Sequence, residues 1–179
     1  MPNFLVVYGS RYGSTEKYAR FIAERLGCAA LPAEKTKAAD LKACNAVIFG
    51  GGVYAGKIAG WKRASRLIRK AGIKRLVLFV CGLADPARQK TRDEAKQLFY
   101  RHLPAETAQK TPVFCLRGGM DYAKLNFTHR TMMAMLLSFL RRKKERSEED
   151  EKLLENYGKK IDFYDEQTAL PVVSAAENL

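Results

Sequence analysis

Histidine is scarce in this sequence, which has only two among its 179 residues, His102 and His129. Neither stands near a plausible nucleophile, so a catalytic triad that depends on histidine is not expected. Both are interpreted as side chains on helix surfaces. Any chemistry that the protein performs is therefore expected to belong to a bound cofactor.

Cysteine is also sparse. The four cysteines are far apart and form neither a CxxC pair nor a metal-ligand spacing: Cys28, Cys44, Cys81 and Cys115. They are interpreted as reduced thiols in a reducing compartment. A bound metal is not expected.

Long hydrophobic runs are missing as well. No stretch reaches the roughly 20 apolar residues that cross a bilayer, and no basic-then-apolar leader opens the chain. These features predict a cytoplasmic protein. With 47% hydrophobic residues, the chain can bury a sizeable core. We expect a single domain over residues 1–165 and a weakly ordered tail over residues 166–179.

Acidic residues are outnumbered. The chain has 32 Lys and Arg against 19 Asp and Glu, a formal net charge of +13. Such an excess favours anionic partners: nucleic acid, an acidic protein or an anionic membrane surface. Nucleic acid is the least favoured, because the basic residues are scattered over expected helix surfaces without base-stacking aromatic residues between them.

Apolar runs alternate with helical patterns along the first two thirds of the chain. Strands are expected at residues 4–9, 28–33, 46–50, 75–82 and 112–119, with helices from about residue 14 to 26 and at 38–44, 61–72 and 92–103. Strands that are mostly apolar and alternate with helices are typical of a parallel sheet buried on both faces. The fold class is therefore α/β.

In such sheets, ligands bind beyond the carboxyl ends of the strands, so the loops at 9–15, 51–60, 82–91 and 117–126 matter most. The first reads GSRYGST. Its glycines do not have the GxGxxG spacing, and no Gly-Lys-Ser/Thr triplet follows. The hydroxyls of Ser10, Ser14 and Thr15, with the amides at a helix start, can bind a terminal phosphate. An ordinary helix N-cap is the alternative.

The other three loops suit a flat ring. GGVYAGKIAG, interpreted as a flexible loop, places Tyr54 between glycines, while CGLADP and RGGMDY add small residues at two neighbouring strand ends. Together the four loops predict a site for a planar heterocycle that carries a terminal phosphate.

YGSRYGST resembles the phosphate loop of flavodoxins, and the resemblance extends over roughly residues 4–140. It implies FMN as the cofactor and a doubly wound, five-stranded parallel sheet in the order 2-1-3-4-5, with helices on both faces. Tyr12 stands where the family has a small hydroxyl residue, and Arg11 adds a charge to the loop. The cofactor-binding residues that the resemblance implies are Ser10, Arg11, Tyr12, Gly13, Ser14, Thr15, Gly52, Val53, Tyr54, Ala55, Gly56, Lys57, Cys81, Gly82, Leu83, Ala84, Gly118, Gly119 and Asp121.

Two segments, VIFGGGVYAGKIAGW and RGGMDYAKLNFTHRTMMAM, are most similar to the flavodoxin-like branch that contains menaquinone-dependent protoporphyrinogen oxidase. This resemblance implies an oxidoreductase that moves electrons between a small organic substrate, such as protoporphyrinogen IX, and a quinone. Tyr54 would contact the ring. Lys57 would bind an acid group of the substrate, or is a solvated loop lysine. The alternative is a one-electron carrier that serves a redox partner protein, although ordinary flavodoxins are acidic.

In the segment FTHRTMMAMLLSFLRRKKER, residues 127–146, nearly the whole helical circumference from residue 132 to 140 is apolar, and a basic block follows. This segment predicts either a peripheral contact with an anionic membrane at its inner face, or a last helix that packs on the sheet.

Overall fold

The computed structural model describes residues 3–179 and divides the chain into two compact units. The sheet unit runs up to Gly118 and resumes at Tyr164–Leu179, and the helical unit is Gly119–Phe163. The sequence predicted one domain up to residue 165. The structure instead returns the chain to the first unit after Phe163.

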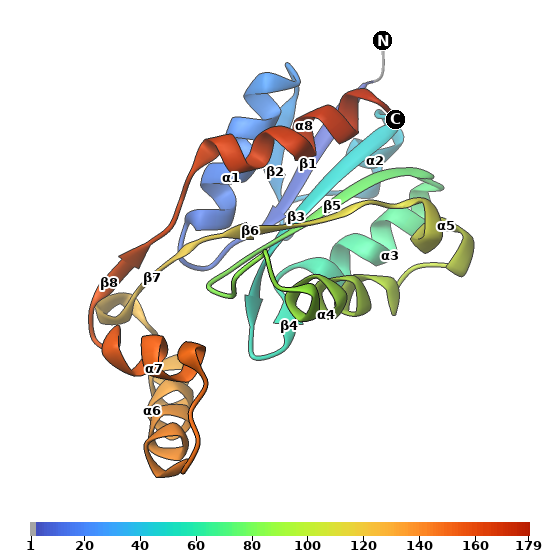
Figure 1. Ribbon diagram of the computed structural model, residues 1–179. Helices are drawn as coiled ribbons and strands as arrows, with labels where there is room; N and C mark the ends of the chain where they lie inside the picture. The colour runs from blue at the N-terminus through green and yellow to red at the C-terminus, as the bar shows by residue number, and fades with distance from the viewer. Residues whose placement is uncertain (1–2) are drawn as a thin grey trace. The chain divides into compact units, whose positions relative to one another are not determined.

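A parallel sheet forms the centre of the sheet unit (Figure 1). Its path is β2-β1-β3-β5-β6, which in sequence order of these five strands is the predicted 2-1-3-4-5. The predicted α/β doubly wound fold is thereby confirmed. The strands are β1 (Phe4–Gly9), β2 (Ala29–Pro32), β3 (Ala46–Tyr54), β5 (Arg75–Gly82) and β6 (Val113–Arg117), and the short β4 (Lys57–Ile58) pairs antiparallel with β3.

Helices cover both faces of this sheet and bury two apolar clusters. One cluster joins Tyr18 and Ile22 of α1 (Ser14–Arg25) to Val172 of α8 (Leu170–Glu177). The other contains Leu41 of α2 (Ala38–Lys42), Trp61 of α3 (Trp61–Ala71) and Phe99 of α4 (Gln89–Tyr100). A further short helix, α5 (Ala105–Lys110), precedes β6.

Helix α8 corrects the expectation of a weakly ordered tail. After the 3-10 turn η2 (Glu166–Ala169), the side chains of Val172, Val173 and Ala176 are buried in the core. Tyr18 fixes the entry to this segment, because its hydroxyl accepts a hydrogen bond from the Asp165 amide at 3.1 Å and donates to the Arg117 carbonyl at 2.7 Å. The short run LPVVSAA is apolar because it covers the sheet face beside α1.

The glycines at the end of β3 are strand residues, although the sequence predicted a flexible loop from residue 51. Gly50, Gly51 and Gly52 pair with β5 in parallel register. A Cβ added at Gly50 would lie 1.9 Å from the Phe79 ring, and one at Gly51 would lie 2.2 Å from Ile58 Cγ2. Glycine is required here because neighbouring side chains fill the space.

The helical unit contains β7 (Gly119–Asp121), the 3-10 turn η1 (Tyr122–Lys124), α6 (Phe127–Arg142), α7 (Glu148–Glu155) and β8 (Lys160–Asp162). Strands β7 and β8 pair antiparallel and so join the two ends of the unit. Over the part of the chain that the structure describes, no helix is both long and apolar enough to cross a membrane.

Candidate functional site

Three of the four predicted loops meet at Gly118, at the carboxyl edge of the sheet. The Gly118 amide donates a hydrogen bond to the Gly82 carbonyl at 2.8 Å, which joins the ends of β5 and β6. A Cβ added at Gly118 would lie 2.6 Å from Cys81 Sγ and 3.1 Å from Ser14 Cβ. The start of α1 therefore lies directly beside the ends of these two strands.

The loop between β1 and α1 has the geometry of an anion site. Gly13 occupies the N-cap position with φ 95° and ψ −23°, a conformation that favours glycine. Gly13 supplies no side-chain cap to α1, and backbone amides at the start of a helix are donors that suit an anion. The Ser10 hydroxyl accepts from the Gly13 amide at 3.1 Å and holds the loop closed.

Tyr54 reaches from the end of β3 to this loop. Its hydroxyl oxygen accepts a hydrogen bond from the Arg11 amide at 3.3 Å. Its ring meets the Tyr12 ring edge-on, with centroids 5.6 Å apart, and the Arg11 guanidinium carbon lies 5.5 Å from its centroid. The hydroxyl also crosses the end of β3, because a Cβ added at Gly52 would lie 2.6 Å from it.

The contacts of Tyr54 show which hydrogen-bond donors the loop could offer to a phosphate. Burial raises the pKa of the Tyr54 phenol, and hydrogen bonds from the backbone of Arg11 and Tyr12 act in the opposite direction. Backbone donors of the loop therefore already converge on one oxygen acceptor, which is the arrangement that a phosphate needs. The loop thus presents donors of the kind that a terminal phosphate needs, and in this structure they bind the Tyr54 hydroxyl.

The other predicted residues have mixed surroundings. Thr15 and Cys81 are buried, and Val53, Gly82 and Leu83 are half-buried near the site. The hairpin tip, Ala55–Lys57, is exposed, as is Ala84. Ala55 has φ 49° and Gly56 has φ 70°, which makes the tight turn between β3 and β4. Lys57 thus extends from a hairpin tip, as a solvated lysine or a substrate contact would.

Gly119 and Asp121 belong to the helical unit, where β7 pairs with β8. The Asp121 carboxylate accepts a hydrogen bond from the Ala123 amide at 3.0 Å and caps η1, which gives this residue a local structural role.

Sequence reasoning missed Arg117. Its guanidinium donates to the Leu83 carbonyl at 3.3 Å and so ties the loop after β5 to the end of β6. A basic residue at the carboxyl end of an expected strand was the available signal.

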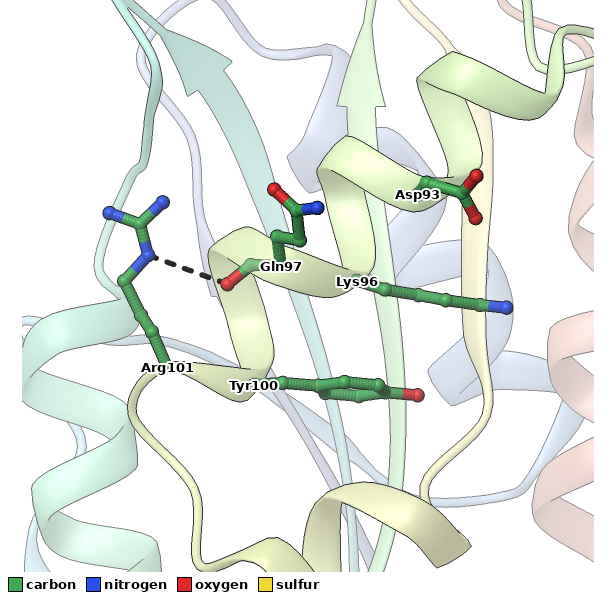
Figure 2. Close-up of a pocket in the computed structure, with 5 residues that line it drawn as sticks. All are labelled: Asp93, Lys96, Gln97, Tyr100 and Arg101. Atoms are coloured by element: carbon green, nitrogen blue, oxygen red, sulfur yellow. Dashed lines mark hydrogen bonds between the residues drawn. The ribbon is translucent and has the colours of Figure 1, made fainter.

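A hollow lies beside α4. Figure 2 shows the side chains that line it: Asp93, Lys96, Gln97 and Tyr100 of this helix, and Arg101, which directly follows it. The Tyr100 hydroxyl donates to the Thr111 carbonyl at 2.8 Å, and Arg101 Nε donates to the Gln97 carbonyl at 3.4 Å. None of these residues belongs to the four predicted loops, so the hollow is distinct from the candidate phosphate site.

Replacing Tyr54 by phenylalanine should strengthen the binding of inorganic phosphate roughly five-fold. The change removes a hydroxyl that competes for the Arg11 amide, and one such hydrogen bond contributes about 1 kcal/mol net. Isothermal titration with phosphate measures the effect. Tyr100→Phe, which removes a hydroxyl bonded to Thr111, is the control and should leave phosphate affinity unchanged. Weaker binding by Tyr54→Phe would show that the hydroxyl is a phosphate ligand rather than a competitor.

The chain is similar to known proteins in both sequence and structure. The sequence matches the flavodoxin domain family over residues 5–147. No curated protein matches it. Structural neighbours include a flavodoxin from the domain Archaea, at 11% identity, with 98% of this chain and 97% of that chain covered and a TM-score of 0.46.

Two further structural neighbours are bacterial. Oxidised flavodoxin 2 from Bacillus cereus is 18% identical, with 99% of each chain covered and a TM-score of 0.47. A flavoprotein in complex with FMN from Lactobacillus acidophilus is 13% identical, with 65% of this chain and 93% of that chain covered and a TM-score of 0.41.

Proposed function

The chain belongs to the flavodoxin family, whose cofactor is FMN, and from that premise we propose that it binds FMN at the carboxyl edge of the sheet and transfers electrons through it. The observation that carries the proposal is that two backbone donors of the loop, from Arg11 and Tyr12, converge on the Tyr54 hydroxyl. Such donors stabilise a terminal phosphate.

The residues of the loop would hold the phosphate through the amides at the start of α1 and the Ser10 and Ser14 hydroxyls. Gly52, Cys81 and Gly82 would border the ring, where small side chains leave room for a flat group. Tyr54 would leave the loop when phosphate enters and then contact the ring. The bound flavin would supply the redox chemistry, and the protein would position it and restrict access of water.

For the reaction itself, we propose an oxidoreductase that passes electrons from a small organic substrate to a quinone-like acceptor, with protoporphyrinogen as the first substrate to test. The similarity of VIFGGGVYAGKIAGW to the protoporphyrinogen oxidase branch supports this choice. The net charge of +13 favours an oxidoreductase over a one-electron carrier of the ordinary, acidic flavodoxin type. The second candidate is a one-electron carrier that serves a redox partner protein.

Anaerobic turnover separates these two functions. The FMN-loaded protein is mixed with protoporphyrinogen and a soluble menaquinone analogue, and porphyrin fluorescence is followed. An oxidoreductase produces porphyrin in amounts far above the protein concentration. A carrier exchanges electrons with a redox protein but produces no porphyrin beyond the uncatalysed rate.

The surface of α6 supports a contact with a membrane. Met135 and Phe139 are 69% and 66% exposed, whereas Leu137 is only 2% exposed. At about 100° per residue, the exposed apolar side lies roughly opposite the buried side. Helices with a second apolar face and basic residues beside it can lie in the interface of an anionic bilayer. We therefore propose a peripheral position at the inner face of the membrane, where a quinone is available.

Flotation with liposomes tests this contact. The protein should float with anionic vesicles at low salt but not with neutral ones, since each well-placed basic residue contributes about 1 kcal/mol. Changing Arg141, Arg142 and Lys144 to glutamine should abolish flotation, as should changing Met135 and Phe139 to serine. Lys143→Gln is the control, because Lys143 is already paired with Asp150 at 2.7 Å. Absence of flotation at low salt would rule out the contact.

A further inference from the structure

The exposed side of helix α3 carries charge of one sign. Its sequence, WKRASRLIRKA, contains five basic residues and no acidic one. The inward side chains, among them Trp61 and Ile68, are buried, and all five basic residues are exposed. Basic residues three and four positions apart are neighbours on a helix and repel one another. Lys62 and Arg63 also stand in the first turn, at the positive end of the helix dipole.

Four other helices of this chain offset part of their positive charge with acidic residues. Basic residues pair with acidic ones at i,i+4 in α1, α4, α5 and α7: Arg20 with Glu16, Lys90 with Glu94, Lys110 with Glu106, and Lys152 with Glu148. Among the side chains that the structure describes, no carboxylate forms an ion pair with a basic side chain of α3. The unpaired basic residues on α3 therefore destabilise this helix, whereas the ion pairs on α1, α4, α5 and α7 do not.

One basic residue of α3 has a structural role. The Arg63 guanidinium donates to the Ala33 carbonyl at 2.9 Å and to the Thr36 carbonyl at 3.0 Å, which anchors the segment after β2. Arg66 Nε instead donates to the Lys62 carbonyl at 3.1 Å on its own helix. Lys62, Arg66 and Arg69 thus remain available to an external anion.

The turn after α4 adds to this charge. The pKa of His102 is lowered by burial and by the nearby charges of Arg101, Arg69 and Lys62. Figure 2 shows that Arg101 extends away from Lys96. We call Lys62, Arg66, Arg69 and Arg101 the cationic face. It joins one side of α3 to the end of α4.

We propose that the cationic face is the docking surface for the acidic surface of a redox partner protein. This inference rests on the proposed electron-transfer function. Helix α3 begins just after the β3–β4 hairpin that borders the candidate site, so the Lys62 end of the cationic face is the end nearest to that site. Guanidinium groups match carboxylates in a bidentate manner. Electrostatic steering suits the small, short-lived interfaces of redox proteins.

Two other polyanions fit the cationic face less well. Single-stranded nucleic acid needs aromatic side chains for base stacking, and a membrane interface needs apolar side chains that insert. The large exposed hydrophobic residues among those described are Phe127, Met132, Met135, Leu136, Phe139, Tyr157 and Phe163. All of them belong to the helical unit, and none lies on the cationic face.

The test compares two variants with the same loss of four positive charges. The first variant changes Lys62, Arg66, Arg69 and Arg101 to glutamine. The control changes Arg20, Lys90, Lys110 and Lys152 to glutamine; each of these pairs within its own helix and lies outside the cationic face. Binding to an acidic [2Fe–2S] ferredoxin is measured by calorimetry at low and high salt. The first variant should bind at least ten-fold more weakly than the unmodified chain at low salt, and the control less than three-fold more weakly. High salt should abolish the difference.

A second readout is the imidazole of His102. Bound carboxylates should raise the pKa of His102, because they offset the charges of Lys62, Arg69 and Arg101. NMR titration of this imidazole with and without ferredoxin measures the change. Equal weakening by both variants would show that only net charge matters and would overturn the proposal. So would a larger effect of the first variant on polyadenylate or on phosphatidylglycerol vesicles than on ferredoxin.

Ferredoxin binding is measured on both the FMN-free and the FMN-loaded chain. If the chain binds no FMN but the first variant still loses its binding to ferredoxin, the docking surface is supported and the proposed function is contradicted. If the chain binds FMN but both variants bind ferredoxin equally well, the proposed function is supported and the docking surface is contradicted.

Discussion

Replacing Gly13 by valine should reduce FMN affinity roughly 100-fold or more while the chain stays folded. A Cβ at this position meets no atom within 4 Å, so the surroundings accommodate the side chain, but φ is 95°. Holding a β-branched residue there costs about 1–3 kcal/mol. Relaxing the backbone would turn the loop amides away from the phosphate, and each charge-assisted hydrogen bond contributes about 1.5–3 kcal/mol. Calorimetry with FMN measures the loss.

Gly27→Val is the matched control for this change. Gly27 follows α1 with φ 61°, and a Cβ there also meets nothing within 4 Å. The control should lose a similar amount of stability and keep its affinity for FMN. Equal FMN affinity in the Gly13 variant and the unmodified chain would show that the loop does not bind the phosphate.

Replacing Trp61 by alanine should lower the free energy of unfolding by about 3–5 kcal/mol. Trp61 is 2% exposed. Its ring packs on Phe49 and Phe99 with centroids 4.9 and 5.0 Å away, and its Nε1 donates to the Phe99 carbonyl at 3.2 Å. The change leaves a cavity and removes the indole hydrogen bond to the Phe99 carbonyl, which keeps only the bond from the His102 amide at 3.2 Å. Denaturation by urea, followed by circular dichroism, measures the effect.

Trp61→Phe keeps an aromatic ring but loses the hydrogen bond, so it should cost less than the alanine change. Since Trp61 begins α3 directly after the hairpin, the alanine variant should also loosen the loop that carries Tyr54. A loss of stability below about 1 kcal/mol, the ordinary effect of a point mutation, would contradict the packing described here.

The sheet could be predicted from the sequence because each strand is a continuous apolar run between helical patterns. FLVVYG and RLVLFVCG are buried on both faces in β1 and β5, and such continuous apolar runs are typical of a parallel sheet covered by helices. The phosphate loop could also be located, since glycine and hydroxyl residues stand between a strand and a helix.

Other features depend on contacts that are distant in the sequence. The glycines at the end of β3 are typical of a flexible loop in the sequence. In the structure they are strand residues, and glycine is required there because Phe79 and Ile58 fill the space that a Cβ would occupy. Helix α8 was missed because its short apolar run, LPVVSAA, gives a weak local signal, whereas its burial depends on α1 and β5. The pairing of β7 with β8 joins segments about 40 residues apart, which local patterns do not reveal.

The contact between Tyr54 and Arg11 could not be anticipated for a similar reason. The sequence placed Tyr54 against a flat ring, because an aromatic residue among glycines is typical of such a site. Its reach to the phosphate loop depends on the hairpin of β3 and β4 and on the lack of a side chain at Gly52. Both are properties of the folded chain.

Calorimetric titration of the unmodified protein with FMN, riboflavin and FAD is the most direct test of the phosphate loop as an FMN site. FMN should bind tightly and riboflavin, which lacks the phosphate, at least 100-fold more weakly, while FAD should bind no more tightly than FMN. Equal affinities for FMN and riboflavin, or FAD bound much more tightly than FMN, would contradict the assignment.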